Sequence, residues 1–381
     1  MSPRTLIHSA RLVTSGHVAH NGWVLFAGDR IAAVGDGDGL HPDSDTVIDA
    51  AGGWLTPGFI DIHGHGGGGA SFDSDADGIR TALALHRSHG TTRSVLSLVT
   101  ASLPDLERQL GVVADAAGAD PLILGSHLEG PFLDQAHRGA HDPTLLRSAD
   151  RGSIDRLLEA AGGTLVQVTL APELPGGMDA LRQLVDASVV VAVGHCAADY
   201  DMARAAFDAG ASILTHAFNA MPGIHHRSPG PVAAAMDSSG VTLEVINDGV
   251  HVHPSVVRRA FEGAPGRVAL ITDAMAAAGA ADGQYMLGTL QATVTDGVAR
   301  LSDSGSIAGS TLTLDTALRL AVTSVGLPVE TAVQALTQTP ARAIGREKDL
   351  GQLAVGFAAD AVLLDSGFAV QGVWGAGNRL R

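Results

Sequence analysis

Length, composition and charge set the first limits on what this chain can be. Its 381 residues exceed the roughly 250 to 300 that one hydrophobic core supports, so we expect a large domain and a smaller one. Hydrophobic residues make up 45% and charged residues 17%, which is typical of a globular protein and excludes a disordered one. The net charge of −16 repels phosphate backbones and anionic lipid, so neither nucleic acid nor a membrane surface is an expected partner.

The usage of single residue types limits the chemistry further. No apolar run approaches the roughly 20 residues that cross a bilayer, and the N-terminus lacks the features of a signal peptide, so a cytoplasmic protein is expected. The one cysteine, Cys196, cannot form an internal disulfide. Lys348 is the only lysine, so Schiff-base chemistry, a Walker A motif or a carbamylated-lysine metal bridge would all require that residue.

The two ends of the chain have the same character. Residues 1–53 contain short runs of alternating apolar and polar residues with Gly or Asp at the breaks, as in TLIHSARLVT and DTVIDAAG. Residues 347–381 have the same pattern. Because chain ends often lie close together, we predict one small β-sandwich domain built from both segments.

Between these segments, residues 54–346 alternate strand-like apolar runs with helix-periodic segments such as SIDRLLEAAG and DMARAAFDAG. The eight apolar runs span residues 54–66, 91–100, 121–130, 164–173, 189–196, 212–219, 241–249 and 267–274. Eight βα units in about 250 residues indicate a (β/α)8 TIM barrel. A doubly wound open sheet also alternates strands and helices and is the competing architecture.

Polar side chains at the ends of these runs favour the barrel. Six of the eight runs end in residues that bind metals or move protons: His63, His65, Glu129, His195, His216, Asp248 and Asp273. The carboxyl ends of barrel strands form one ring, so these residues would converge, whereas an open sheet would spread them along an edge. A single histidine is usually a structural residue, but seven reactive residues after runs of Val, Ile, Leu and Thr are hard to explain in that way.

The His-x-His pair predicts a metal site. At strand spacing His63 and His65 point to the same side, so one ion can bind both. Imidazole and carboxylate ligands suit zinc, iron or another first-row divalent metal. Glu129 could bridge this ion to a second one held by His195 and His216, and Asp273 would then lie beside the activated water as general base. Gly64, Gly66 and Gly69 also fit a dinucleotide-binding G-x-G-x-x-G, but no good helix follows them.

Taken together, several motifs resemble the amidohydrolase superfamily and, within it, the N-acetylglucosamine-6-phosphate deacetylase family. The resemblance covers nearly the whole chain and rests on PGFIDIHGHG, HLEGPF, RGAHDP, VGHC, THAFNAMPGIHHR, NDGVHV, ITDAM and SGSIAGSTLTL. It implies deacetylation of N-acetyl-D-glucosamine 6-phosphate to glucosamine 6-phosphate and acetate, in amino-sugar catabolism and cell-wall recycling. A deaminase, a cyclic-amide hydrolase and a non-enzymatic barrel scaffold are the alternatives.

The resemblance also implies roles for single residues. The implied metal ligands are His63, His65, Glu129, His195, His216 and Asp273, and the implied catalytic residues are Asp273 and His141. The implied substrate-binding residues are Ala140, His141, Asn219, Ala220, His226, Arg227, His251, Ile307, Ala308 and Gly309. His226 and Arg227 match a phosphate-binding pair that the family contributes across a homodimer interface, and a homotetramer is a further option.

The implied cofactor is one or two divalent metal ions per chain, with zinc as the first choice and iron, cobalt, manganese or cadmium as alternatives. Some members of the family replace the His-x-His pair by amides and use one ion, whereas this chain keeps both His63 and His65, so two ions are expected. Ser228 stands where many relatives have Glu, and the resemblance gives no account of this loop.

Overall fold

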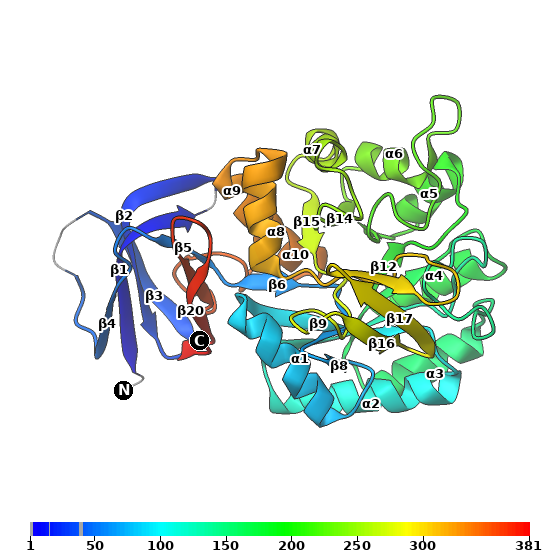
Figure 1. Ribbon diagram of the computed structural model, residues 1–381, viewed down its shortest axis with the longest axis horizontal. Helices are drawn as coiled ribbons and strands as arrows, with labels where there is room; N and C mark the ends of the chain where they lie inside the picture. The colour runs from blue at the N-terminus through cyan, green and yellow to red at the C-terminus, as the bar shows by residue number, and fades with distance from the viewer. Residues whose placement is uncertain (1–2, 15, 38–40) are drawn as a thin grey trace. The chain divides into compact units, whose positions relative to one another are not determined.

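One of two eight-stranded sheets is a parallel barrel in a computed structural model that describes residues 3–14, 16–37 and 41–381. Its eight strands follow one another in chain order, each pairing with the next. They are β6 (Phe59–Asp61), β9 (Thr91–Val99), β10 (Ile123–Glu129), β11 (Leu165–Leu170), β12 (Val190–Val193), β13 (Ile213–Leu214), β14 (Thr242–Ile246) and β15 (Val268–Ile271). Each of the eight apolar runs contains one of them, so the predicted (β/α)8 barrel is confirmed (Figure 1).

The barrel is nearly closed where its first and last strands end. Just beyond β15, the Asp273 backbone N–H donates a 2.8 Å hydrogen bond to the carbonyl of His63, which follows β6. All nine residues of β9 are buried, as expected for a parallel strand covered on both faces. The carboxyl ends of β6 and β15 therefore lie side by side, which places His63 next to Asp273.

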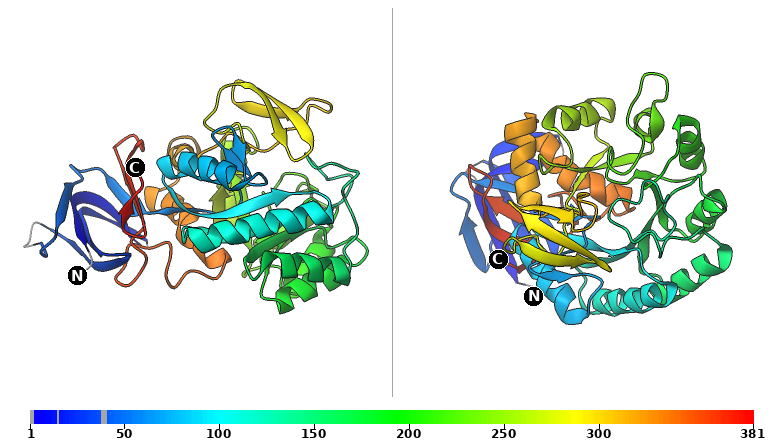
Figure 2. Two further views of the ribbon diagram at one scale, coloured as in Figure 1. Left: turned by 90° about the horizontal axis from the view of Figure 1, so that it is seen from below. Right: turned by 45° about the vertical axis from the view of Figure 1, so that its right-hand side comes forward.

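Helices lie between successive strands of the barrel. They are α1 (Ala76–Ser88), α2 (Leu103–Ala119), α3 (Arg151–Ala161), α4 (Gly177–Asp186), α5 (Tyr200–Asp208), α6 (Gly230–Asp237) and α7 (Pro254–Gly263). Figure 2 shows α2 to α7 as an arc around the strands. Side chains cap several of these helices: Ser102, Asp150, Asp199 and His253 accept hydrogen bonds from first-turn backbone N–H groups of α2, α3, α5 and α7.

The second large sheet combines both ends of the chain. Its strands are β1 (Arg4–Thr14), β2 (His17–Ala27), β3 (Arg30–Asp36), β4 (Thr46–Asp49), β5 (Trp54–Pro57), β19 (Ala361–Leu364), β20 (Val370–Gly375) and β21 (Asn378–Arg379). Ile7, Phe26, Leu55 and Trp374 belong to its buried hydrophobic cluster. Both terminal segments thus contribute strands to one sheet.

One strand differs from expectation. The run 54–66, read as the first barrel strand, contains two strands separated at Gly58: β5 pairs with β1 and β19 in the terminal sheet, and only β6 joins the barrel. A Cβ at Gly58 would lie 2.2 Å from the Thr92 hydroxyl oxygen, so only glycine fits where the chain passes from one sheet to the other.

By their internal contacts the residues form two compact units. One consists of Met1–Asp61, His86–Arg93 and Thr313–Arg381, with the gaps given above, and the other of Ile62–Leu85 and Ser94–Leu312. The first unit also contains α8 (Leu314–Leu320), a π-helix (Ala321–Val325), α9 (Val329–Leu336) and α10 (Gln338–Ala343). Every candidate site residue lies in the second unit.

An antiparallel sheet follows β15 within the second unit. Its strands are β16 (Gly283–Leu287), β17 (Leu290–Thr295) and β18 (Val298–Leu301), and a two-stranded ribbon is formed by β7 (Gly66–Gly67) and β8 (Ala70–Ser71). Leu287 and Ala292 pack with Val99 and Met275 in one buried cluster, which anchors this sheet to the strand ends of the barrel. Among the described helices, none combines the length and apolar character that a bilayer span requires.

Candidate active site

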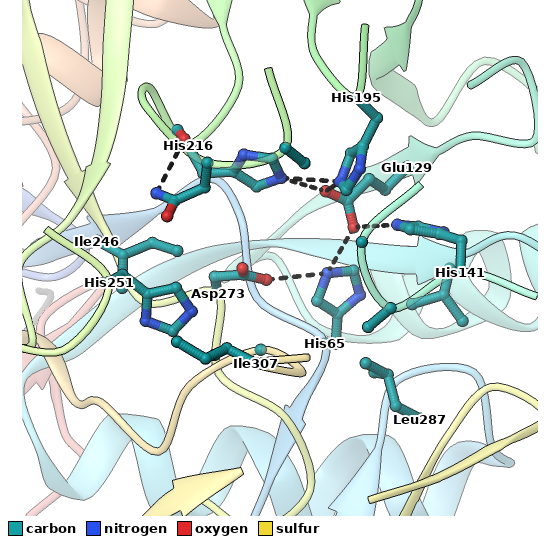
Figure 3. A pocket seen from close by; sticks show the side chains of 16 residues that line it. His65, Glu129, His141, His195, His216, Ile246, His251, Asp273, Leu287 and Ile307 are labelled. Atoms are coloured by element: carbon teal, nitrogen blue, oxygen red, sulfur yellow. Dashed lines mark hydrogen bonds and ion pairs between the residues drawn. The ribbon is translucent and has the colours of Figure 1, made fainter. Parts of the chain in front are cut away.

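A cavity of about 220 Å³ opens at the carboxyl ends of the barrel strands (Figure 3). Most of the reactive strand-end residues point into it. Its lining consists of His65, Val99, Glu129, Gly139, Ala140, His141, His195, His216, Asn219, Ala220, Ile246, His251, Asp273, Leu287, Ile307 and Gly309. The cavity is thus formed by barrel strands, by the 139–141 loop, by Leu287 at the end of β16 and by the segment that follows β18.

Three ligand atoms form a tight triangle in this cavity. Glu129 Oε1 lies 3.1 Å from His195 Nε2 and 3.0 Å from His216 Nε2, and the two nitrogens are 2.9 Å apart. Atoms that share one zinc ion at 2.0 to 2.1 Å in a tetrahedral arrangement lie roughly 3.3 Å apart. The triangle is therefore slightly smaller than one face of a tetrahedral zinc coordination shell.

A second group of ligand atoms lies on the other side of Glu129. His65 Nε2 is 3.1 Å from Glu129 Oε2 and 3.2 Å from Asp273 Oδ1. His63 Nε2 is 3.4 Å from Glu129 Oε1 and 3.6 Å from the same Asp273 oxygen. Glu129 lies between the two groups, which is the position a bridging carboxylate would need.

The chemistry of the donors fits divalent metal binding. His195 Nδ1 lies 2.8 Å from the carbonyl oxygen of His137, and because a carbonyl only accepts, Nδ1 carries the hydrogen. The lone pair of His195 is therefore on Nε2, which faces Glu129 and His216. Two imidazole nitrogens and a carboxylate directed at one point are the donor set that zinc and related metals take.

Unusual backbone conformations direct these side chains inward. His195, His216, Ala220 and Asp273 have φ values of 46°, 26°, 51° and 48°, in the left-handed region that non-glycine residues rarely adopt. All four line the cavity. Such conformations cost on the order of 1 to 3 kcal/mol each and concentrate at functional sites, where the surrounding structure enforces them.

Burial and neighbouring charges shift the pKa values of the cluster. Burial alone would raise the pKa of Asp273, but the hydrogen bond from His65 and the charge of His63 outweigh it and lower the pKa to about 2. The pKa of Glu129 is also well below its usual range, because His63 and three hydrogen-bonding histidines outweigh the effect of burial. Both side chains are thus carboxylates at neutral pH, suited to bind a cation or accept a proton.

His141 and His251 are held by different partners. The Thr100 hydroxyl lies 2.9 Å from His141 Nδ1, and His141 Nε2 is 3.3 Å from Glu129 Oε2; burial lowers the pKa of His141 to about 4, so it is neutral. His251 Nδ1 donates a 2.7 Å hydrogen bond to Asp248. Burial alone would lower the pKa of His251, but the hydrogen bond and charge of Asp248 outweigh it and raise the pKa.

Not every residue singled out in the sequence reaches the cavity. Ala140, Asn219, Ala220, Ile307 and Gly309 line it, and Ala308 is buried beside them. His226 and Arg227 are exposed in the loop between β13 and α6 and are not among its lining residues. Asp248, read as one of the convergent strand-end residues, contacts His251 and the backbone N–H groups of Val250 and His251 instead of the metal-type cluster.

The structure adds residues that the motifs did not identify. Glu244 on β14 is fully buried and accepts a 2.9 Å hydrogen bond from His63 Nδ1. His127 on β10 is also fully buried and bonds to the hydroxyls of Ser97 and Thr169, both at 2.9 Å. Each is a polar residue inside an apolar run and lies two positions before a residue that lines the cavity. That two-residue spacing was the feature of the sequence that could have identified them as residues facing the barrel interior.

The fold is a (β/α)8 barrel, and histidine and carboxylate side chains that can hold a metal ion converge at the carboxyl ends of its strands. This combination defines the class of metal-dependent barrel hydrolases. The chain belongs to the amidohydrolase family, whose model matches residues 54–380.

Individual relatives resemble the chain over nearly its full length. It is 38% identical over 375 residues to the N-acetylgalactosamine-6-phosphate deacetylase of Escherichia coli O157:H7, covering 97% of both chains. It is 37% identical over 324 residues to the N-acetylglucosamine-6-phosphate deacetylase of Vibrio furnissii, covering 84% of this chain and 81% of that one. The chain also superposes on a solved structure of the N-acetyl-D-glucosamine-6-phosphate deacetylase of Mycobacterium smegmatis, with a TM-score of 0.95, 45% identity and full coverage of both chains. That structure is of a variant in complex with N-acetyl-D-glucosamine-6-phosphate.

Proposed function

We propose that this protein hydrolyses the acetamide of N-acetyl-D-glucosamine 6-phosphate, giving D-glucosamine 6-phosphate and acetate. The observation that carries the proposal is the meeting of Asp273, His141 and the Glu129 ligand cluster in one cavity. The full-length similarity to a sugar-phosphate deacetylase bound to this compound supports the choice of substrate. The proposed setting is amino-sugar catabolism and cell-wall recycling in the cytoplasm, where phosphorylated sugars are found.

We infer that the chain holds one or two divalent ions, with zinc as the first choice. Glu129, His195 and His216 would hold one ion, and His63, His65 and Asp273 would hold the other with Glu129 between them. Bound there, a divalent metal supplies Lewis-acid activation of the attacking water and of the amide carbonyl.

The protein's own residues would then move the protons. Asp273, ionised because of its lowered pKa, accepts the proton of the attacking water as the new C–O bond forms. His141 donates a hydrogen bond to the developing oxyanion from Nε2, the nitrogen that faces Glu129, and the Thr100 hydroxyl, 2.9 Å from Nδ1, holds the ring in place. Asp273 returns the proton to the amine nitrogen as the C–N bond breaks, which releases acetate and the amino sugar.

Binding of the sugar phosphate is assigned to the cavity wall and to a neighbouring subunit. Asn219, Ala220, His251 and the segment Ile307 to Gly309 would hold the sugar. His226 and Arg227 are exposed in their own chain, which suits residues that complete the site of a second copy in a homodimer, or in a tetramer built from such dimers. A guanidinium at the phosphate would supply the positive charge that a chain of net charge −16 needs locally.

Steady-state kinetics on three compounds tests the proposal. We expect N-acetylglucosamine 6-phosphate to be turned over with a kcat/KM at least ~100-fold above that of unphosphorylated N-acetylglucosamine, since a charge-assisted phosphate contact is lost. N-acetylgalactosamine 6-phosphate is the third compound, because one 38% identical relative bears that substrate in its name. A higher kcat/KM for the galactosamine compound would reassign the substrate, and equal rates with and without phosphate would contradict the proposal.

A further inference from the structure

Glu244 is a charged residue in a place where charges are rare. It lies in the middle of β14, whose five residues are all buried, and its exposed fraction is 0%. Ile246, two residues further on the same side of the strand, lines the active-site cavity. Glu244 is therefore one layer deeper in the barrel interior, directly beneath the ligand cluster.

Three hydrogen-bond donors converge on this carboxylate. Its Oε2 accepts from His63 Nδ1 at 2.9 Å and lies 3.4 Å from the backbone nitrogen of His216. Its Oε1 accepts from Gln167 Nε2 at 3.0 Å. A buried carboxylate is strongly unfavourable without such partners, so the barrel interior is built around it.

The contact with His63 determines where the lone pair of that imidazole lies. Because a carboxylate only accepts, Nδ1 of His63 carries a hydrogen, so the lone pair that His63 can offer to a metal ion is on Nε2, which faces Glu129 and Asp273. A carboxylate that accepts the second N–H of a metal-binding histidine fixes the ring and makes the ligand nitrogen more basic.

The other candidate ligand histidines have weaker partners or none within the described residues. His195 Nδ1 donates to a neutral carbonyl, and the Nδ1 atoms of His65 and His216 make no hydrogen bond in the described part of the chain. Among these four rings, His63 is the one whose Nδ1 contacts the buried carboxylate of Glu244. The two sides of the cluster are therefore supported unequally.

We propose that Glu244 is a positioning residue that orients His63 and thereby sets how tightly the His63 and His65 side of the cluster holds its metal ion. This inference rests on the proposed metal dependence of the function. Glu244 does not touch the substrate in this account and is not a catalytic residue. Its effect is on ion retention at one side of the cluster, while the Glu129, His195 and His216 side keeps its ion.

Zinc titration of the purified protein in competition with a chelator tests the inference, with bound zinc measured by elemental analysis. We expect two ions per wild-type chain. In Glu244→Met, which keeps the length but removes the acceptor, one ion should bind 10- to 100-fold more weakly, the usual cost of losing such a partner, while the other changes by less than about 3-fold. Glu244→Gln should fall between, because its amide oxygen still accepts the Nδ1 hydrogen without the charge.

Gln167→Met is the matched control. It removes a donor to the same carboxylate at the same depth in the barrel but leaves the bond to His63, so it should keep two ions per chain. Circular dichroism checks that each variant is folded. Loss of an ion in this control, or unchanged binding of both ions in Glu244→Met, would overturn the inference.

A double-mutant cycle with His63→Asn shows whether Glu244 acts through His63. If it does, Glu244→Met should have no additional effect on zinc affinity once His63 is replaced. Equal losses from Glu244→Met with and without His63 would contradict the inference. A wild-type protein that binds two zinc ions with the predicted Glu244 dependence but releases no acetate would refute the proposed function alone.

Discussion

Asp273 is proposed to act both as a metal ligand and as the residue that transfers protons. Its Oδ1 is 3.2 Å from His65 Nε2 and 3.6 Å from His63 Nε2, and its pKa is lowered to about 2. Its backbone closes the barrel through the carbonyl of His63 and adopts a left-handed conformation. The fold therefore fixes both the place and the charge of this carboxylate.

Replacing Asp273 by Asn should abolish turnover while leaving sugar-phosphate binding measurable. The amide cannot take the proton of the attacking water, and general acid–base catalysis contributes on the order of 10² to 10⁴ in rate. The variant and the wild type are compared by kcat and by calorimetric binding, with metal content measured for both. Asp237→Asn, at an exposed carboxylate that accepts a hydrogen bond from the Tyr200 hydroxyl, is a control that should keep wild-type turnover. Near-normal kcat in the Asp273 variant would refute the assignment.

Asp248 should act through His251 on substrate affinity. The pKa of His251 is raised by Asp248, so the charged imidazolium persists to higher pH in the wild type. In Asp248→Asn the pKa of His251 falls, so His251 loses its charge at a lower pH. We therefore expect KM for the phosphorylated substrate to begin rising at a lower pH than in the wild type, with kcat largely unchanged. Measuring KM from pH 6 to 9 tests this; superimposable KM profiles would rule it out.

At the scale of elements, the start of α8 depends on one charged contact. Asp315, in the first turn of α8, lies 2.9 Å from His89 Nδ1 and accepts from the Thr313 hydroxyl and the Thr316 backbone N–H. Burial opposes ionisation, but the hydrogen bonds from His89 and Thr313 outweigh it and lower the pKa of Asp315 below its usual range. A carboxyl whose pKa is lower in the folded state contributes stability above its unfolded pKa and loses it as the pH falls through the folded pKa.

Asp315→Asn should therefore lower the free energy of unfolding by about 1 to 2 kcal/mol at pH 7, the usual cost of losing a hydrogen bond to a charged group. The difference from the wild type should shrink at acid pH, where protonation removes the charge of the wild-type carboxyl. Urea unfolding at both pH values measures it. A difference that stays constant with pH would mean that the charge of Asp315 plays no part.

The sequence predicted the barrel because each strand coincides with an apolar run and each reactive residue follows one. It misplaced β5, since Trp54–Pro57 and Phe59–Asp61 form one uninterrupted apolar run and only the close approach of Gly58 to Thr92 separates them. It overlooked Glu244, because attention to strand ends does not reveal which mid-strand residue faces the barrel interior. It also gave no sign that Asp248 would bond to His251, a contact that depends on how the chain turns after β14.

In the assembled protein, the proposed phosphate site requires that Arg227 serve a neighbouring subunit. Mixing two inactive variants tests this requirement. In a dimer of one Arg227→Ala chain and one Asp273→Asn chain, one site receives both native residues, so random mixing should restore about a quarter of the wild-type activity. Sedimentation analysis confirms subunit exchange. If exchanged mixtures stay as inactive as the parents, Arg227 does not act across an interface.

Metal-dependent release of acetate is the decisive measurement for the proposed deacetylase activity. The purified protein, its metal content known, is incubated with N-acetylglucosamine 6-phosphate before and after treatment with a chelator, and acetate is quantified. Lewis-acid activation worth several kcal/mol predicts a fall of roughly 10³-fold on chelation, reversed by one or two equivalents of zinc per chain. Acetate release that is unaffected by complete removal of the metal, or no release from the zinc-loaded protein, would contradict the account.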